Sequence, residues 1–578
     1  MSTLMVAAID FGTTFSGYAF AFKADLQNDK LKIQTNQAWN GGQQKLISLK
    51  TPTCLLLDRN RKFVSFGYEA ETEYTEILLD EDKDHNDFYY FNRFKMELHG
   101  SRVISTDMKL REAGGKELRA MTVFSESIGA LKKHLDDLLD LRGTTIDPDE
   151  IEWVLTVPAI WTDSAKQFMR KACVEAGIKD HLLRIALEPE AASIYCQHLP
   201  TERLGGAEKG FSVSTVGTRY MVIDLGGGTA DITVHEKLDS GRLREIYRAS
   251  GGASGGTAVD ECFLELFRKL FGNEVMQILK DEKVEAYTDL VREFEVTKRN
   301  VKPNNNGKIS MMIPYITIEE LCQSIHGKGL KEVLAKSVMA KHVGVTGNKL
   351  RFESQVMEGI FRAVTSEIIE YITLVLGQPE VQGVERFLLV GGFSESAMVQ
   401  NAIRDAFPGK RLIIPDEPGL AVLKGAVLYG NEPQTISERS IKYSYGVKTA
   451  PEFDEKKHDP KRKFESGGKT RCSSVFSSFM HANTVVPINA EVVKKYQTNE
   501  AYQKILPIEV FYSISDDPRY TDESCVQRLG IMEVEIPNPS KERRKVEVHF
   551  FFGGTEMEIV ALDLETNTPC EYSFNLLS

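Results

Sequence analysis

The sequence has no pair of cysteines at the spacing of a zinc site and no long apolar run. Its eight cysteines are scattered, without a C-x-x-C pair or a Cys/His cluster, which excludes the common zinc modules. No stretch of about 18 apolar residues occurs, so no transmembrane helix is expected. The apolar residues 4–9 form too short a run for a signal peptide. We therefore expect a cytoplasmic protein whose cysteines are reduced and buried.

Basic residues are scarce relative to acidic ones. Lys and Arg number 71 and Asp and Glu number 83, which gives a formal net charge of −12. A protein that binds nucleic acid through its phosphate backbone needs the opposite sign, so we expect no nucleic-acid partner. No periodic pattern indicates an obligate oligomer, and a monomer is the default expectation.

The first three quarters of the chain have an α/β pattern. Residues 153–157 form a buried-strand run that is followed by a proline and then by a helical stretch ending before Gly177. Residues 124–141 have apolar side chains at helical spacing, with Ser125 as the expected N-cap. The 578 residues should hold roughly three to four domain-sized units at about 150 residues per domain.

From residue 431 onward the pattern changes to short alternating stretches separated by turns. Residues 506–513, 530–536, 545–552 and 556–564 have this alternation, which predicts antiparallel strands and an all-β domain. Residues 450–469 are dominated by charge, glycine and proline, and are expected to form a surface loop.

One sequence pattern occurs twice. Residues 5–22 and 220–234 each read as an apolar strand, an aspartate, a glycine turn with threonine, and a returning strand. The spacing of the two aspartates, 224 − 10 = 214 residues, favours an internal duplication that places a cleft between two lobes. Taken singly, each pattern is more typical of a plain hairpin turn.

Glycine turns of this kind suit a phosphate, because the backbone N–H groups can approach it without a Cβ in the way. The aspartate before each turn, Asp10 or Asp224, would lie beside the phosphates and hold Mg²⁺ through its water shell. The turns comprise Gly12, Thr13 and Thr14 in the first copy and Gly226, Gly227, Gly228 and Thr229 in the second.

Several strings, in a fixed order, resemble motifs of the 70-kilodalton heat-shock chaperone family within the actin-like ATPase superfamily. They are IDFGTTFSG (9–17), TVPAIWTDSAKQ (156–167), LEPEAA (187–192), IDLGGGTADI (223–232), SGGASGGTAVDECF (250–263), FEVTKR (294–299) and LLVGGFSES (388–396). Sugar kinases and actins share the first features but not the EPEAA, FEVTKR and VGGFSES set. The resemblance implies ATP or ADP with Mg²⁺ as cofactors, and K⁺ as a further candidate cation.

The resemblance also implies roles for individual residues in the cleft. Asp231 would orient the attacking water, Lys95 would face the transferred phosphate, and Glu188 would join the water and metal network. Thr229 would position water. The implied nucleotide contacts are Gly12, Thr13, Thr14, Phe15 and Gly226 to Gly228 at the phosphates; Gly255, Gly256 and Asp260 closing over them; Glu295, Lys298 and Arg299 at the adenosine; and Gly391, Gly392 and Phe393 at the final turn.

The sequence departs from the family pattern at the base and at the linker. Where the family has a second base-stacking arginine the chain has Phe393, Ser394 and Glu395, and the later acidic position is Gly419. The apolar linker of the family is replaced by a polar stretch, residues 434–445. These differences leave open how adenine is bound and whether the two domains are coupled.

The expected architecture is a two-lobed, duplicated ribonuclease-H-like ATPase domain followed by an all-β sandwich without a helical lid. Only 578 − 564 = 14 residues follow Leu564, too few for a lid, as in the divergent lid-less heat shock 70 kDa protein 12 branch of the family. The expected ranges are 1–430 for the ATPase domain (lobe I 1–217, lobe II 218–385, return to lobe I 386–430), 431–445 for the linker and 446–578 for the sandwich.

Three functions fit these residues. The first is an ATP-binding, slowly hydrolysing chaperone-like switch whose nucleotide state modulates ligand binding by the β-domain. The second is a nucleotide-stabilised binding or adaptor protein that recognises a protein, peptide or glycan ligand, with vestigial hydrolysis. The third is a small-molecule kinase, which would need an acceptor site that the sequence does not reveal.

Overall fold

The structure is a computed structural model of one chain. It describes residues 3–36, 39–40, 47–80, 82–101, 104–207, 213, 215–303, 307–466, 468–498, 500–570 and 572–577. Helices and several sheets alternate up to residue 431, and antiparallel sheets follow, as the sequence predicts.

The first large sheet is built around β1, whose six residues are all buried. Its strand order is β13 (Leu183–Leu187), β12 (Ile151–Val157), β1 (Met5–Asp10), β2 (Phe15–Phe22) and β3 (Gln34–Thr35). Alternate residues of a strand point to opposite faces. Met5, Ala7 and Ile9 accordingly pack with α4 (Ala120–Leu141) and α5 (Asp163–Glu175), whereas Val6 and Ala8 pack with α6 (Glu188–Cys196) and α14 (Pro418–Asn431).

The second large sheet repeats this arrangement. Its strand order is β14 (Leu204–Gly205), β22 (Arg411–Pro415), β21 (Arg386–Val390), β15 (Arg219–Leu225), β16 (Ala230–Lys237), β17 (Leu243–Gly252), β23 (Ile436–Ser440) and β28 (Val485–Pro487). β15 pairs in parallel with β21 and antiparallel with β16, just as β1 pairs with β12 and β2. Each pattern of strand, aspartate and glycine turn therefore occupies the same place in its sheet.

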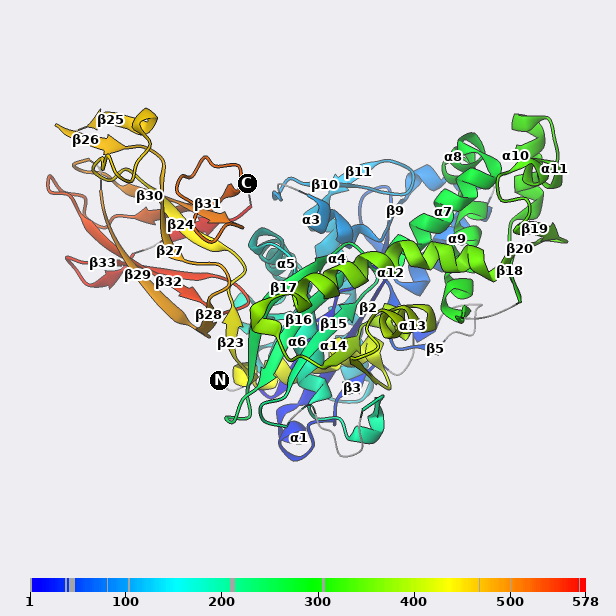
Figure 1. The fold of residues 1–578 in the computed structure, drawn as a ribbon, viewed down its shortest axis with the longest axis horizontal. Coiled ribbons are helices and arrows are strands. Elements are labelled where there is room, and N and C mark those ends of the chain that lie inside the picture. Colours follow the sequence, from blue (N-terminus) through cyan, green and yellow to red (C-terminus); the bar gives the residue numbers. More distant parts are fainter. Residues whose placement is uncertain are drawn as a thin grey trace.

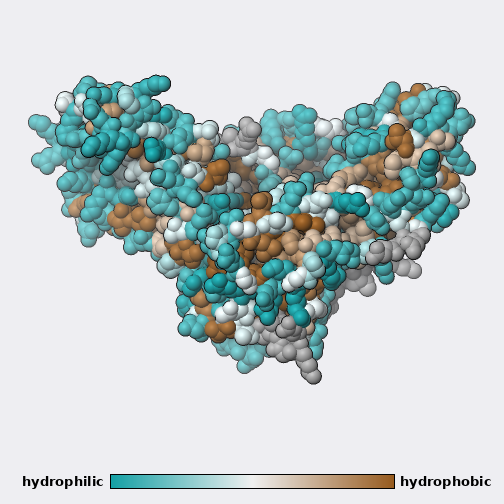
Figure 2. Space-filling model, viewed as in Figure 1, coloured by the Kyte–Doolittle hydropathy of each residue, from teal (hydrophilic) through white to brown (hydrophobic). Residues whose placement is uncertain are grey.

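Helices cover the second sheet and extend beyond it. They are α7 (Gly256–Phe271), α8 (Asn273–Asp281), α9 (Val284–Asn300), α10 (Tyr315–His326), α11 (Leu330–Lys336), α12 (Ser354–Leu376) and α13 (Ala397–Ala406), with a small sheet of β18 (Lys308–Met312), β19 (Val343–Thr346) and β20 (Lys349–Glu353). Figure 1 shows α10 and α11 at one end of the molecule and the C-terminal strands at the other. Figure 2 shows apolar side chains gathered between these two mainly hydrophilic ends.

The helix expected at residues 124–141 is α4, but it begins at Ala120. Ser125 is not its N-cap, because the Ser125 hydroxyl lies inside the helix and donates to the carbonyl of Thr122. The two residues Ala120 and Met121 before the predicted start are buried, so core packing extends the helix by a turn.

The C-terminal region is all-β, as the alternation predicts. One sheet has the order β27 (Val475–Met480), β24 (Ser444–Thr449), β30 (Ile505–Ser513), β31 (Val526–Glu535) and β35 (Tyr572–Asn575), and the other has β29 (Ala490–Gln497), β32 (Lys545–Phe552), β33 (Glu558–Asp563) and β34 (Thr568–Pro569). Val510 and Met532 of the first sheet share a core with Val548 and Phe550 of the second. In the described part of the chain no α-helix follows α14.

Two expectations for this region need correction. Residues 450–469 are not only loop, because β25 (Lys463–Ser466) pairs with β26 (Lys469–Cys472) as a hairpin. The polar stretch expected as a free linker contains β23, which pairs with β17 and β28. This strand is hard to predict from the sequence because it contains the charged Arg439. In the structure Arg439 is buried against Glu190 of α6 and is not exposed.

None of the helices in the described ranges is long and apolar enough to cross a membrane.

The backbones of helices α6 and α14 are in direct contact, and both helices pack against the same face of the first large sheet. A Cβ on Gly425 would lie 1.7 Å from the carbonyl oxygen of Ala191. We expect Gly425→Ala to lower the free energy of unfolding by about 1–3 kcal/mol because the helices must move apart. Chemical denaturation followed by circular dichroism measures this change.

Gly359→Ala is the matched control. Gly359 is also helical, in α12, but no atom lies within 4 Å of its Cβ position. It should raise stability by about 0.5–1 kcal/mol through helix propensity. Equal effects of the two substitutions would contradict the close packing of α6 and α14.

Candidate functional site

A cavity of about 620 Å³ lies where the two large sheets face each other. The strand ends of β1 and β15 reach it, as do the two glycine turns, α9 and the turn after β21. Most of the predicted residues line it: Asp10, Gly12, Thr13, Thr14, Phe15, Lys95, Glu188, Asp224, Gly226, Gly227, Gly228, Thr229, Gly256, Glu295, Lys298, Arg299, Gly391, Gly392 and Phe393. Gly255, Asp231 and Asp260 do not line the cavity.

The two glycine turns touch each other across the cavity. A Cβ on Gly227 would lie 2.3 Å from the Thr14 hydroxyl oxygen, and one on Gly228 would lie 2.4 Å from the Thr13 hydroxyl oxygen. Gly391 adopts φ +86°, and its Cβ would lie 2.3 Å from a carboxylate oxygen of Asp224. Only glycine allows these turns to approach so closely.

Gly255 supports the second turn rather than the cavity. Its N–H donates to the carbonyl of Gly228 at 3.2 Å, and the N–H of Gly256 donates to the carbonyl of Gly226 at 3.1 Å.

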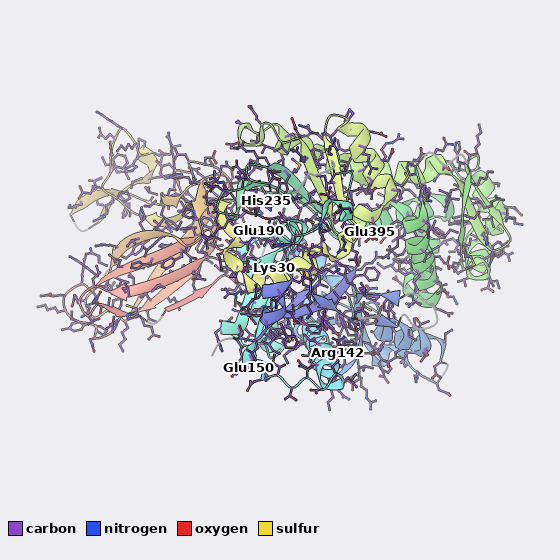
Figure 3. All side chains as sticks on the ribbon, turned by 90° about the horizontal axis from the view of Figure 1, so that it is seen from below. Lys30, Arg142, Glu150, Glu190, His235 and Glu395 are labelled. Atoms are coloured by element: carbon purple, nitrogen blue, oxygen red, sulfur yellow. The ribbon has the colours of Figure 1, made fainter. Side chains whose placement is uncertain are left out.

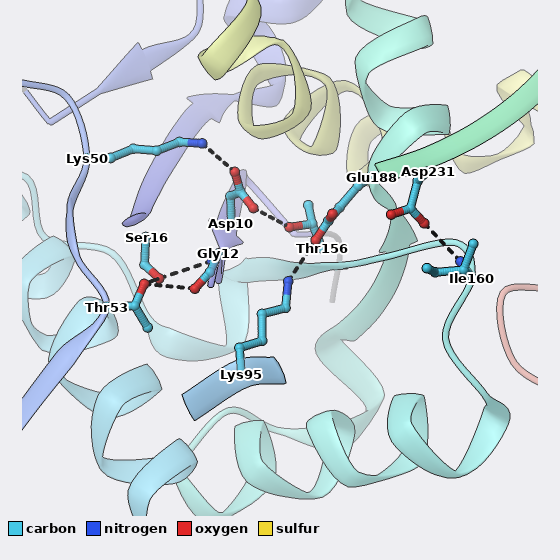
Figure 4. A network of polar contacts seen from close by, with 10 residues as sticks. All are labelled: Asp10, Gly12, Ser16, Lys50, Thr53, Lys95, Thr156, Ile160, Glu188 and Asp231. Atoms are coloured by element: carbon cyan, nitrogen blue, oxygen red, sulfur yellow. Dashed lines mark hydrogen bonds and ion pairs between the residues drawn. The ribbon is translucent and has the colours of Figure 1, made fainter. Parts of the chain in front are cut away.

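Asp10 lies at the end of β1 with two donors on its carboxylate (Figure 4). The Thr156 hydroxyl donates to Oδ1 at 2.8 Å, and Lys50 Nζ lies 2.6 Å from Oδ2. Burial raises the pKa of Asp10, but the Lys50 ammonium outweighs this and holds the pKa below its ordinary value. Asp10 is therefore ionised at neutral pH.

Glu188 and Lys95 form a buried pair at the first turn of α6 (Figure 4). Lys95 Nζ lies 2.8 Å from Glu188 Oε1, and it also lies 5.1 Å from the centroid of the Trp161 ring. The pKa of Glu188 is raised to about 7, chiefly by burial. The positive charge of Lys95 lowers this pKa, but the negative charges of Asp10 and Asp231 raise it, so Lys95 offsets only part of the rise.

Asp224 and Asp231 face each other across β15 and β16. Burial and the neighbouring carboxylates raise the pKa of Asp224 well above its ordinary value, and burial also raises that of Asp231. The N–H of Ile160 donates to Asp231 Oδ1 at 2.9 Å, while Oδ2 has no partner among the described residues. These acids therefore form a site that a cation would stabilise.

Asp260 does not close over the cavity as predicted. It accepts an ion pair from Lys298 Nζ at 2.6 Å and a second from Arg93 at 2.8 Å. Glu295 pairs with Lys298 at 2.5 Å and with Arg299 at 2.8 Å. Burial raises the pKa of Glu295, but these two cations outweigh it and lower the pKa to about 2. The three residues of the α9 motif thus share one face, as their spacing predicts.

The turn after β21 contributes Phe393, Glu395 and Ser396 to the cavity and no arginine. The rings of Phe393 and Phe361 are stacked, with their centroids 6.5 Å apart, and Phe393 carries no positive charge. Glu395 lies toward Gly419, whose Cβ would be 3.0 Å from Glu395 Oε1. Asp416 and Glu417 also line the cavity, and both pair with Arg203, while Glu417 also pairs with Lys424.

Sequence reasoning missed Lys50 as a residue that lines the cavity and Thr156 as a buried hydrogen-bond partner of Asp10. Thr156 could have been found, because it is the residue of β12 in register with Asp10. Lys50 precedes a Thr-Pro pair and belongs to no phosphate motif, so no signal in the sequence marks it.

The donor set fits a hydrated divalent ion. In the described ranges, no three His, Cys, Asp or Glu side chains are arranged to ligate a metal directly. Asp10 and Asp224 reach the cavity from opposite sheets, which suits an ion held through its water shell.

Comparison with known proteins decides the family. The model described as Hsp70 protein matches residues 101–554. The chain belongs to the Hsp70 family. Heat shock 70 kDa protein 12B of Homo sapiens is 33% identical over 99% of this chain and 91% of its own length. Heat shock 70 kDa protein 12A is 32% identical in both Homo sapiens and Mus musculus, over 100% of this chain and 92% of either relative.

The raised pKa of Glu188 makes the stability of this Hsp70-family chain depend on pH. The native state keeps the Glu188 proton up to about pH 7, whereas the ordinary pKa is 4.5. The native state therefore binds more protons between these values, and the stability from Glu188 is lost as pH rises. Relative to Glu188→Gln, the wild type should lose up to about 3 kcal/mol of unfolding free energy between pH 4.5 and 7.

Urea denaturation of both proteins at several pH values measures this difference. Glu274→Gln, on the exposed side of α8, is the control and should leave the pH dependence unchanged. A wild-type minus Glu188→Gln difference that does not vary with pH would contradict the burial argument.

Proposed function

We propose that the protein binds ATP in this cavity, hydrolyses it slowly, and uses the nucleotide state to modulate a ligand site on its C-terminal sheets. The observation that carries this proposal is that both glycine turns, Asp10, Asp224 and Lys95 converge on one cavity between two sheets of the same topology. Membership of the Hsp70 family supports ATP binding at the family level.

The proposed phosphate site follows from the geometry of the turns. Thr13, Thr14 and the N–H groups of Gly227 and Gly228 would hold the phosphate oxygens, because the N–H of Gly226 already donates to the carbonyl of Thr229. Lys95 would place its ammonium against charge that develops on the transferred phosphoryl group. Mg²⁺, when bound, would neutralise phosphate charge while Asp10 and Asp224 hold its water shell.

Asp231 is the proposed group that positions and deprotonates the attacking water. Its Oδ1 accepts from the Ile160 N–H, while its Oδ2 is buried and has no hydrogen-bond partner among the described residues, so a buried water would satisfy that oxygen. Thr229 and Glu188 line the cavity beside it and would complete the water network. The adenosine would lie against Glu295, Lys298 and Arg299.

Direct hydrogen bonds join this site to the C-terminal region. Lys442, which follows β23, donates to the carbonyl of Ile160 at 2.5 Å, and the N–H of that same residue donates to Asp231. Asp231 and Lys442 are therefore bonded to the backbone of the same residue, Ile160. This contact supports coupling between nucleotide and the C-terminal sheets.

The same region docks on the first large sheet through α5. Arg170 pairs with Glu556, whose Oε2 lies 2.6 Å from Nη2, and the Gln167 amide bonds the backbone of Phe574 and Leu576. Arg439 donates to both carboxylate oxygens of Glu190 and to the carbonyl of Gly553. Figure 3 labels Glu190 on the side of the molecule nearer the C-terminal strands.

We propose the corresponding domain organisation: a two-lobed actin-like ATPase domain, residues 1–430, and a β-sandwich, residues 446–578, that takes a protein, peptide or glycan ligand. The intervening residues 431–445 would act as a docked strand rather than a free linker, because β23 is paired on both edges. The eight unpaired cysteines fit a cytoplasmic setting.

An adaptor function with vestigial hydrolysis is the second candidate. The observation that favours it is that Glu395 and Gly419 line the cavity where the family pattern has a cation and an acid. Ligand binding that does not respond to nucleotide, together with absent turnover, would favour this candidate.

Single-turnover hydrolysis of Mg-ATP tests the role of Asp231. We expect Asp231→Asn to slow turnover by about 10²–10⁴-fold, because an amide cannot accept the proton of the attacking water. Nucleotide binding, followed as a shift in melting temperature, should persist.

Asp239→Asn is the control, since Asp239 is exposed in the turn between β16 and β17. It should hydrolyse at the wild-type rate. Unchanged turnover in Asp231→Asn would contradict the assigned role, and absent turnover in the wild type would leave the adaptor function.

A further inference from the structure

A second cavity, of about 90 Å³, lies where the two large sheets meet the C-terminal region. The start of α5, the end of β13 and the middle of β17 form part of its wall, and the end of β23 and the turn between β32 and β33 form the rest. Glu245 of β17 lines this cavity and is only 4% exposed. The C-terminal region therefore contributes to the burial of this carboxyl group.

Glu245 is buried without a hydrogen-bond donor. Within the described ranges its carboxyl group has no hydrogen bond and no ion pair. A buried carboxylate without such partners is strongly unfavourable, whereas a protonated carboxyl group loses much less on burial. The surroundings of Glu245 therefore decide whether it can carry a charge.

Three cations face Glu245, and each is held by another group. Arg439, at the end of β23, donates to both carboxylate oxygens of Glu190. Lys442 donates to a backbone carbonyl before α5, and Lys166 of α5 lies 3.3 Å from Asp163. None of the three makes an ion pair with Glu245 in the described part of the chain.

The other neighbours of Glu245 do not supply a positive charge. His235 of β16 is in register with Glu245, and burial lowers the pKa of His235 to about 4, so its ring is neutral above that pH. Glu190 adds a negative charge nearby. Glu556, from the turn after β32, pairs with Arg170 and is itself acidic.

We propose that Glu245 is a proton-binding site at the contact between the C-terminal region and the two large sheets. It is a neutral carboxylic acid while the C-terminal region covers it, and an ionised carboxylate when that region is released into water. Docking of the C-terminal region thus takes up a proton and is favoured by acidification. Glu245 does not line the nucleotide cavity, so this site is independent of the proposed function.

The direction of the pKa shift agrees with this geometry. Burial and the charge of Glu190 raise the pKa of Glu245 well above 4.5, and Arg439, Lys166 and Lys442 offset only part of the rise. The docked state therefore binds more protons than the released state above pH 4.5. The contribution of Glu245 to docking is complete below pH 4.5 and is lost as pH rises.

The other titratable groups around the cavity change charge outside this range. Burial lowers the pKa of Lys442 only to about 8, so Lys442 is charged in both states at lower pH. Tyr443 and Tyr445 also line the cavity, and burial raises the pKa of both, so they stay neutral. The range from pH 5 to 7.5 therefore isolates Glu245.

Hydrogen exchange of the full chain, resolved to the Leu576 amide, measures docking at each pH. This N–H donates to the side-chain oxygen of Gln167 in α5 at 2.9 Å, so its protection reports the contact between the C-terminal region and the first large sheet. We compare wild type with Glu245→Gln, which stays neutral at every pH. The ratio of their protection factors should fall by up to about tenfold per pH unit between pH 5 and 7.5.

Two further variants separate the proton from the packing. Glu245→Met has a side chain of similar length and no titratable group, so it should give the same pH-dependent ratio as Glu245→Gln. Glu533→Gln removes an exposed carboxyl group of β31, and its ratio to wild type should stay constant with pH. A ratio of wild type to both Glu245 variants that does not change between pH 5 and 7.5 would overturn the proposal. A ratio that rises with pH would overturn it as well.

Discussion

The burial of four carboxylates in one place is the constraint on which the rest of the structure depends. Asp10, Glu188, Asp224 and Asp231 are each at most 8% exposed, and like charges at such positions repel strongly. Asp10 ends β1 of the first sheet, Asp224 lies one residue before the end of β15 of the second, Asp231 pairs with Asp224 on β16, and Glu188 begins α6. Lys50 and Lys95 offset part of the charge, and a cation with a phosphate ligand would offset more. Because a bound cation would reduce the repulsion among these carboxylates, the fold is suited to binding a charged ligand at this place.

The same centre is joined to the C-terminal sheets through buried polar contacts instead of an apolar linker. Arg439 is held by Glu190 on one side and Gly553 on the other, and burial of such a pair makes the loss of either partner costly. Lys442 extends this region to Ile160, because it donates to the carbonyl of Ile160 while the N–H of Ile160 donates to Asp231. The polar sequence after residue 431 is thus compatible with tight docking, since its charges are directed inward.

Much of this could be predicted from the sequence, and the failures have physical reasons. The hairpins around Asp10 and Asp224, the helix α4 and the C-terminal strands follow from periodicity and glycine turns, which are local signals. Strand β23 was missed because Arg439 looks like a surface residue until Glu190, 249 residues away, is placed beside it. Lys50 and the ion pairs of Asp260 with Arg93 and Lys298 were missed for the same reason. Interactions between distant segments carry no local pattern.

Hydrogen exchange of the full chain, measured without nucleotide and with Mg-ADP or Mg-ATP, tests the central claim most directly. The account predicts slower exchange in the turns at residues 12–15 and 226–229 with either nucleotide, and a difference between ADP and ATP in β23 and at Ile160. Protection of the turns without any response in β23 would leave a nucleotide site uncoupled from the C-terminal sheets. Exchange that is the same in all three conditions would contradict the account.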